Sequence, residues 1–250
     1  MRATISKAEI QADIATRFGD AFKVQEKTVV ETLSTGIAEV NLLIGGGVPR
    51  GAISEIFGPA SSGRTSLMLS MLAYATTHDE VCALVDTDDV FTPTVAAAAG
   101  IDLDRLLWIR CNTNLEHAFK AADLLLHAGG FGLVILDLGD VPGKEARRVI
   151  SSWWYRFRRT VENRPTALMV MSEEACTRSC ASLTLEMNGT GEWQRTDPRN
   201  NALPLFDVAT RPRKVAHANL LHVNSIKINR RRPLIPGLNE CDFRVRAVIT

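Results

Sequence analysis

Residues 53–65 read ISEIFGPASSGRT, and this stretch decides the fold. The apolar run before Gly58 predicts a strand and the residues from Thr65 onward predict a helix, so the loop between them joins a strand end to a helix start. Gly58 and Gly63 can adopt backbone conformations that other residues avoid, which lets successive amides point at an anion near a helix N-terminus. The spacing is that of a phosphate-binding loop, although Arg64 stands where such loops normally carry lysine.

A second motif supports this interpretation. The run GLVILD at 132–137 predicts a buried strand that ends in a carboxylate, and Asp137 can hold magnesium through water while Thr65 offers a hydroxyl. The sequence therefore predicts a site for ATP or ADP with Mg²⁺, and the residues expected to line it are Gly58, Pro59, Ala60, Ser61, Ser62, Gly63, Arg64, Thr65 and Ser66. The alternative is a tight glycine turn followed by an incidental aspartate at a strand end.

Composition limits the class of protein. The chain has 250 residues, 46% hydrophobic and 23% charged, which is typical of a globular protein with one sizeable core. A formal net charge of +1 excludes a polycationic nucleic-acid coat. No apolar run approaches the roughly 18 to 20 residues of a membrane span, and the N-terminus is unlike a signal peptide, so a cytoplasmic protein without membrane contact is expected. Its five cysteines are scattered and odd in number, which favours reduced, structural thiols.

The hydrophobic pattern predicts an α/β fold, with a RecA-like core of mainly parallel strands flanked by helices and antiparallel strands added in the C-terminal third. Residues 5–18 predict a detached helix that could join copies of the chain, so residues 1–31 are expected to form an N-terminal arm and linker and residues 32–250 the core domain. Strands are predicted at 52–57, 81–85, 106–109, 133–136, 167–171, 183–187, 220–228 and 243–249, and helices at 65–76, 92–99, 115–128 and 144–163.

Three segments carry a resemblance to a known family. Residues 33–65, 82–93 and 132–140 resemble the ATPase core of the RecA recombinases. The sequences of these motifs are most similar to those of the ImuA-like accessory proteins of bacterial translesion mutagenesis. The resemblance covers most of the chain from about Thr32 onward. It implies a role in DNA repair during the SOS response, association with the nucleoid after DNA damage, and as partners a Y-family polymerase-like protein and a replicative-type error-prone polymerase, with RecA or DNA as further partners.

Departures from the RecA pattern bear on hydrolysis. Asp88 stands where RecA has the glutamate that positions the attacking water, and it is one methylene shorter. Glu173 falls where RecA has part of an Asn-Gln pair that senses the γ-phosphate, and a carboxylate there repels a triphosphate. Together with Arg64, these changes predict nucleotide binding without efficient hydrolysis. The alternative is that Asp88 and Glu173 do not align with those roles.

The resemblance also bears on DNA handling. Only a few residues separate Glu173 from the strand-like segment 180–187, so the second DNA-binding loop of RecA has no counterpart. The lysines that act between RecA subunits fall near Lys227 and Asn229, and one of the two is absent.

Two basic regions could contact a partner. The first is helix 144–163, where an apolar stripe leaves several arginines on other faces; these either form a solvated surface or contact DNA. The second is a segment whose candidate residues are Arg213, Lys214, Lys227, Arg230, Arg231 and Arg232, and Pro233 favours an exposed, extended connection for its last three residues. This patch could bind a phosphate backbone or an acidic protein face.

Two functions remain open. One is a RecA-like adaptor, without recombinase activity, that recruits or regulates an error-prone polymerase assembly. The other is an active DNA-dependent ATPase of the recombinase type, in which Arg64 and Asp88 are working substitutes.

Overall fold

The computed structural model describes residues 16, 31–139, 141–142, 144, 151–195, 220–234 and 238–249. The chain divides into two units, Met1–Val30 and Glu31–Thr250. Apart from Thr16, the helix predicted at 5–18 lies outside the described residues, so the N-terminal arm and its role in oligomerisation stay predictions.

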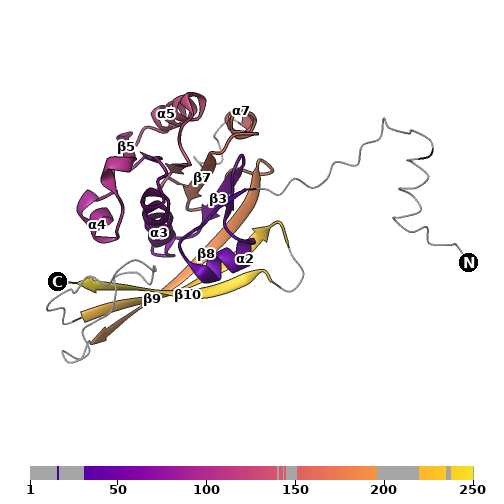
Figure 1. Ribbon diagram of the computed structural model, residues 1–250. Coiled ribbons are helices and arrows are strands. Elements are labelled where there is room, and N and C mark those ends of the chain that lie inside the picture. Colours follow the sequence, from indigo (N-terminus) through magenta and orange to yellow (C-terminus); the bar gives the residue numbers. More distant parts are fainter. Residues whose placement is uncertain are drawn as a thin grey trace, which may run out of the picture. The chain divides into compact units, whose positions relative to one another are not determined.

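The second unit is built on a sheet of eight strands, drawn in Figure 1. Their order across the sheet is β10-β9-β8-β3-β7-β6-β4-β5, and the six strands from β8 to β5 run parallel while β9 and β10 are antiparallel to their neighbours. In chain order the strands are β3 (Ile53–Phe57), β4 (Cys82–Asp86), β5 (Leu106–Arg110), β6 (Leu133–Asp137), β7 (Ala167–Ser172), β8 (Ala181–Arg195), β9 (Leu220–Arg232) and β10 (Glu240–Ile249). A small second sheet pairs β1 (Thr32–Leu33) with β2 (Val48–Pro49).

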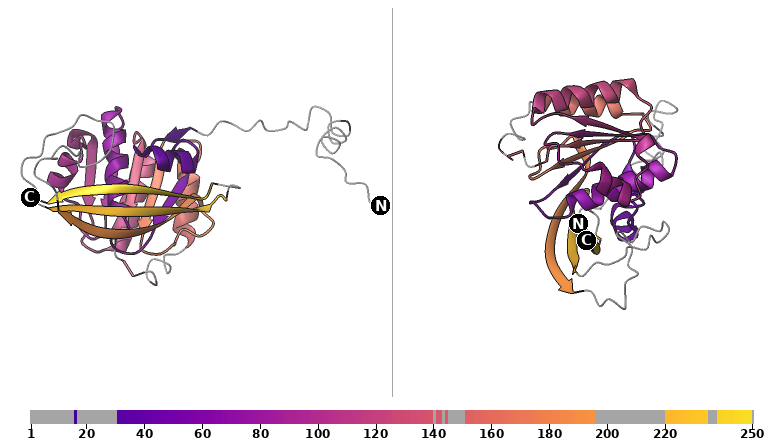
Figure 2. Two further views of the ribbon diagram at one scale, coloured as in Figure 1. Left: turned by 90° about the horizontal axis from the view of Figure 1, so that it is seen from below. Right: turned by 90° about the vertical axis from the view of Figure 1, so that its left-hand side faces the viewer.

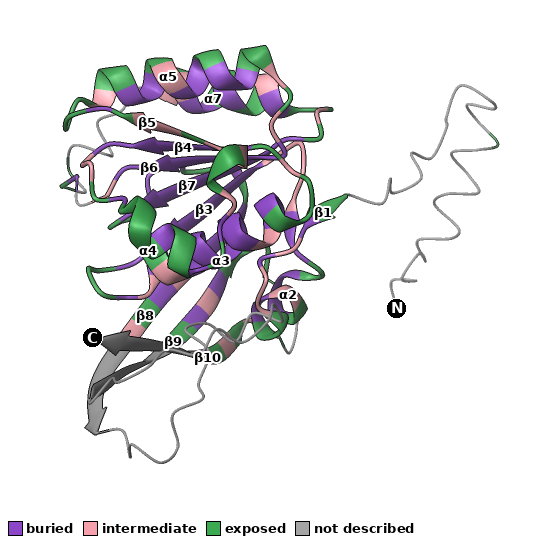
Figure 3. Cartoon of the chain, turned by 60° about the vertical axis from the view of Figure 1, so that its left-hand side comes forward, coloured by how far each residue is buried: buried purple, intermediate pink, exposed green. Residues whose placement is uncertain are grey.

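Helices cover both faces of the large sheet, and Figures 2 and 3 show the layers. One face packs against α2 (Ala38–Ile44), α3 (Arg64–Thr77) and α4 (Pro93–Ala98). The other face packs against α5 (Leu115–Ala128) and α7 (Ser151–Val161). A 3-10 turn, η2 (Leu103–Arg105), leads into β5. Because both faces are covered, the central strands β4, β6 and β7 are buried along their whole length, which explains why their sequences are continuous apolar runs.

The last three strands extend the sheet. β8 pairs in parallel with β3 along Ile53–Phe57, and in its later part it pairs with the antiparallel β9 up to Arg195. The helix α2 packs against β9 and β10, and the guanidinium of Arg230 on β9 donates to the carbonyl of Leu43 on α2 at 2.8 Å.

The predicted fold class is confirmed. Helix α7 occupies 151–161 of the predicted span 144–163, of which residues 145–150 lie outside the described part. The expectation that residues 230–232 form a connection is wrong, because they complete β9. Arg231 and Arg232 are exposed as expected, whereas Arg230 is only 6% exposed. A proline after the run ends the strand rather than excluding it.

Candidate nucleotide-binding site

The loop at 58–63 joins the centre of the sheet to the longest helix of its face. The amide of Gly58 donates to the carbonyl of Ser172 at the end of β7, and the amide of Ser62 donates to the carbonyl of Pro59. Gly63 has φ +95°, a left-handed conformation that glycine adopts without strain, and α3 begins at the next residue. The first amides of this 14-residue helix therefore face the loop, which is the arrangement that attracts anions.

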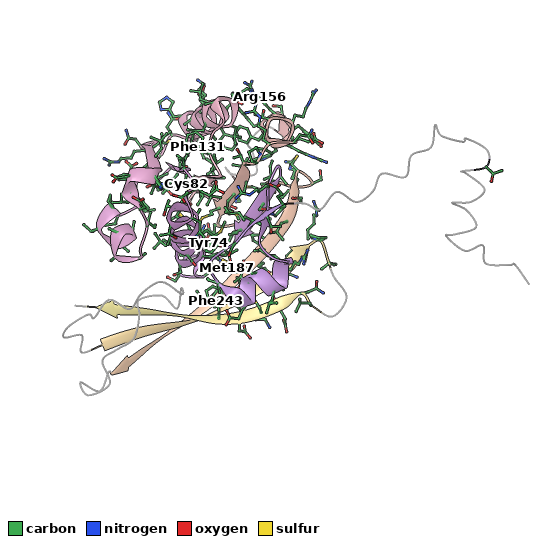
Figure 4. The ribbon with its side chains drawn as sticks, in the orientation of Figure 1. Tyr74, Cys82, Phe131, Arg156, Met187 and Phe243 are labelled. Atoms are coloured by element: carbon green, nitrogen blue, oxygen red, sulfur yellow. The ribbon has the colours of Figure 1, made fainter. Side chains whose placement is uncertain are left out.

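Strands β8 and β9 pack closely against this loop. A Cβ added to Gly58 would lie 2.3 Å from the carbonyl oxygen of Met187 on β8, and one added to Gly63 would lie 2.2 Å from Cδ1 of Ile226 on β9. Met187 and Ile226 are both fully buried, and Figure 4 labels Met187. Only glycine fits at these two positions, so the C-terminal strands fix the shape of the loop.

The loop retains polar groups suited to a nucleotide. The Ser62 hydroxyl is buried and has no hydrogen-bond partner among the described residues. The side chain of Thr65, at the second position of α3, is exposed. An orphaned hydroxyl, a glycine-lined cradle and a helix N-terminus fit a phosphate group. Magnesium usually binds through one or two protein ligands together with substrate phosphates, and Thr65 and Asp137 are the residues that would hold it.

Asp137 is a buried carboxylate at the end of β6. It is 6% exposed, and its Oδ1 accepts a hydrogen bond from the amide of Gly139 at 2.8 Å. Burial raises the pKa of Asp137 to about 6 from 3.8; the Gly139 amide and Arg64 oppose this rise, while Asp86 and Asp88 add to it. A strongly perturbed carboxyl beside other charges is typical of functional sites.

Arg64 connects the two motifs. It is 8% exposed, and its Nη1 donates to the carbonyl of Gly139 at 3.1 Å. Arginine is almost never so deeply buried unless it is paired. Its guanidinium is directed to the turn after β6, where it offsets the negative charge of Asp137.

Asp88 lies at the same turn. Gly139 has φ +55°, and a Cβ built on it would lie 2.1 Å from Oδ2 of Asp88, so the carboxylate rests against this glycine. Asp88 also lines a surface hollow of about 640 Å³ together with residues 112–116 and 141–142. The structure therefore brings Arg64, Asp88 and Asp137 together around Gly139.

Asp86, at the end of β4, has a structural role. Its Oδ2 accepts hydrogen bonds from the Phe91 amide at 3.0 Å and from Trp108 Nε1 at 3.2 Å. These bonds hold the segment that follows β4, and so they position Asp88 two residues later.

Glu173 follows directly after β7 and is exposed, whereas its neighbour Ser172 is buried next to the phosphate loop. The position is adjacent to the cradle, and its role as a sensor stays a prediction. The connection from β7 to β8 spans only residues 173–180.

Sequence reasoning missed Glu55, a buried acid in the middle of β3. Its Oε1 accepts hydrogen bonds from the amides of Cys176 at 2.6 Å and Thr177 at 2.8 Å, so it fixes the short β7–β8 connection. Burial and the nearby Glu55 carboxylate raise the pKa of the Cys176 thiol, which is therefore unreactive. All five cysteines are free thiols. The signal in the sequence was a charged residue in the middle of a short strand predicted to be buried.

Of the described residues predicted to form the basic patch, the structure removes only Arg230 from the surface. Arg213 and Lys214 lie outside the described residues. Arg230 is buried, and burial lowers its pKa. The other three are exposed and engaged: Lys227 pairs with Glu240 at 2.8 Å, Arg231 Nε donates to Glu186 at 2.7 Å, and Arg232 donates to the carbonyl of Arg178 at 3.0 Å.

Two kinds of feature are absent from the described residues. These residues contain no cluster of three or more His, Cys, Asp or Glu side chains that could hold a metal ion by itself. None of their helices combines the length and apolarity that crossing a bilayer requires.

The fold and the loop together define the class of P-loop α/β proteins. Comparison with known proteins narrows this class: residues 5–145 match the family model described as the RecA N-terminal domain. The chain therefore belongs to the RecA family.

Individual relatives agree with this assignment. The chain is 38% identical over 121 residues to Protein RecA of Nostoc punctiforme, a match that covers 48% of this chain and 32% of the relative. Protein RecA of Prochlorococcus marinus is 38% identical over the same length, with 31% of it covered, and that of Synechococcus elongatus is 36% identical, with 33% covered. The match thus spans about a third of the length of these curated relatives, and it shows the family rather than the activity.

Proposed function

We propose that this protein is a RecA-like accessory protein of DNA repair that binds ATP or ADP with Mg²⁺, hydrolyses it inefficiently, and recruits or regulates an error-prone polymerase assembly in translesion synthesis. In this proposal it is related to the ImuA-like proteins, and its partners are a Y-family polymerase-like protein and a replicative-type polymerase. The observation that carries the proposal is the Arg64 guanidinium, which is buried and hydrogen-bonded to Gly139 beside Asp137.

The contacts around the loop support nucleotide binding without efficient hydrolysis. The loop amides, the Ser62 hydroxyl and Thr65 supply donors for phosphate oxygens. Asp88 is held against Gly139 by the geometry of that turn, and a short carboxylate so placed has little freedom to orient a water molecule. A displacement of about 1 Å can lower a rate by about a hundredfold. The short β7–β8 connection, which Glu55 fixes, leaves little chain with which to grip a DNA strand.

The test combines a binding titration with a rate measurement. We expect calorimetry to detect Mg·ADP and Mg·ATP binding, and Thr65→Val to weaken it by about tenfold, equivalent to about 1.4 kcal/mol. Thr77→Val, the same exchange at the far end of α3, is the matched control and should bind as the wild type does. Absence of binding by the wild type at millimolar nucleotide would refute the proposal.

The second candidate is an active DNA-dependent ATPase, and one observation favours it: Asp88 lines a hollow that is open to solvent, so water can reach it. The two functions differ in turnover with single-stranded DNA. The accessory role predicts a rate below the usual enzyme range of about 1 to 1,000 per second. Faster turnover that Asp88→Ala abolishes would establish the ATPase instead. Polymerase recruitment is tested by pull-down of the two polymerases with the full-length chain.

A further inference from the structure

A second hollow, of about 820 Å³, lies along α7 beside the C-terminal end of α5. Its lining includes His127 from α5, then Tyr155, Arg156 and Arg159 from α7, and then Glu162 and Arg164 from the segment after it. Its volume is within the range of small-ligand sites, roughly 300 to 1,000 Å³. Because Asp123 already pairs with Arg156, the net charge comes from Arg159 and Arg164 against Glu162, and this balance favours an anion.

This hollow is separate from the nucleotide site. The phosphate loop follows the C-terminal end of β3, whereas Arg164 shortly precedes the N-terminal end of β7, and β3 and β7 are parallel. The two sites therefore lie at opposite ends of the parallel strands. The hollow also belongs to the face covered by α5 and α7, while α3 covers the other face.

Two of the arginines are held in place before any ligand arrives. Arg156 makes a two-pronged ion pair with the buried Asp123 of α5, with Nε to Oδ1 at 2.7 Å and Nη2 to Oδ2 at 2.5 Å, and its guanidinium lies 5.7 Å from the centre of the Trp153 ring. Figure 4 labels Arg156 at this outer side of the molecule. Arg164 Nη1 donates to the carbonyl of Leu126 at 2.7 Å. Groups that are already oriented lose less entropy when they bind a ligand.

The remaining groups are open to a ligand. Arg159 is exposed and has no ion-pair partner within the described part of the chain. One turn before it, Tyr155 keeps 52% of its surface exposed, so a ligand can reach its ring. A free guanidinium fork beside an exposed aromatic ring is the combination that binds a phosphate together with an unstacked base.

We propose that this hollow binds single-stranded nucleic acid. Arg159, with Arg156 and Arg164 behind it, contacts the phosphodiester backbone, and one base stacks on Tyr155. An acidic protein surface would satisfy the arginines but would leave the tyrosine ring without a matching flat partner. A duplex keeps its bases stacked, so it cannot use the ring either. The proposal does not depend on nucleotide binding at the phosphate loop.

The test measures the affinity of the full-length protein for a fluorescent thymidine oligonucleotide by anisotropy over a salt series. Arg159→Glu should weaken binding by about tenfold at 0.1 M salt and flatten the salt dependence, because one phosphate contact is lost. Arg158→Glu is the matched control: it makes the same charge change on the adjacent exposed residue, which does not line the hollow, and it should cause a smaller loss. Tyr155→Ala should weaken binding by about fivefold or more, whereas Tyr155→Phe should retain it.

Several results would overturn the proposal. Equal losses for the two arginine variants would mean that binding is diffuse electrostatic attraction. Equal behaviour of Tyr155→Ala and Tyr155→Phe would exclude stacking. If poly-glutamate displaces the oligonucleotide and Arg159→Glu weakens both ligands equally, the hollow binds an acidic protein. If inorganic phosphate alone displaces the oligonucleotide, the hollow binds a free anion. A wild-type protein that does not bind the oligonucleotide would refute the inference outright.

Discussion

The buried charge of Asp137 is expected to destabilise the folded protein. Replacing this residue should therefore stabilise the fold while weakening nucleotide binding. The variant Asp137→Asn keeps an oxygen that can accept the hydrogen bond from the Gly139 amide and removes only the buried charge. We expect it to unfold at a higher denaturant concentration than the wild type at pH 7.5 and to bind Mg·ADP more weakly.

The magnitude follows from the pKa. Because the folded-state pKa of Asp137 is about 6 and the ordinary value is 3.8, the charged form is disfavoured in the folded protein by about 3 kcal/mol. This penalty is present in full above pH 6 and disappears as pH falls toward 4, because the folded state then takes up the proton before the unfolded state does. The variant should therefore be more stable by about 1 to 3 kcal/mol at pH 7.5, and this advantage should shrink to near zero at pH 4.

The assay is urea unfolding of both proteins at pH 7.5, 6 and 4, with nucleotide binding measured at pH 7.5. Asp123→Asn is the matched control, because Asp123 is also buried but makes the two-pronged ion pair with Arg156; it should destabilise the protein. The reasoning is refuted if Asp137→Asn is less stable than the wild type at pH 7.5, or if its advantage does not change with pH.

Three other substitutions test the packing around the site. Gly63→Ala should destabilise the protein by more than about 1 kcal/mol, because the new methyl group strains a left-handed residue and collides with Ile226. In a double-mutant cycle, Ile226→Ala should relieve part of this loss of stability, and strictly additive effects would argue against the contact. Glu55→Ala should cost about 2 to 4 kcal/mol in denaturant unfolding, since it leaves two amides without an acceptor, and an unchanged midpoint would show that water replaces the carboxylate. Arg230→Ala should lower the melting temperature clearly whereas Lys227→Ala on the same strand should hardly move it, because only Arg230 is buried against Leu43; equal effects would contradict that difference.

Much of the fold could be predicted from the sequence because the patterns that indicate strands and helices are local. The parallel strands are short apolar runs, and the helices between them have the expected period, so their positions followed from pattern alone. The phosphate loop and Asp137 were also predictable, since each follows a strand in the order that the chemistry requires.

Other parts of the site depend on contacts between distant segments, which no local pattern records. The packing of Ile226 against Gly63, and the reach of Arg64 to Gly139, join residues far apart in the chain. The exposure of Arg230 was wrongly predicted because charge normally indicates a surface, whereas this arginine is buried and donates to a carbonyl on α2. The hollow along α7 likewise required the placement of two helices and the segment after them.

The position of β3 has a consequence for the order in which the protein folds. This strand pairs with β7 and with β8, more than a hundred residues later in the chain, and its loop is finally pressed into shape by Met187 and Ile226. Contacts of such long sequence separation form slowly, because a large loop must close before they are made. During synthesis on the ribosome, the phosphate loop emerges early but cannot acquire its shape until β9 has been translated. Nucleotide should therefore bind only to chains that include β9, and a chain truncated before β9 should bind none.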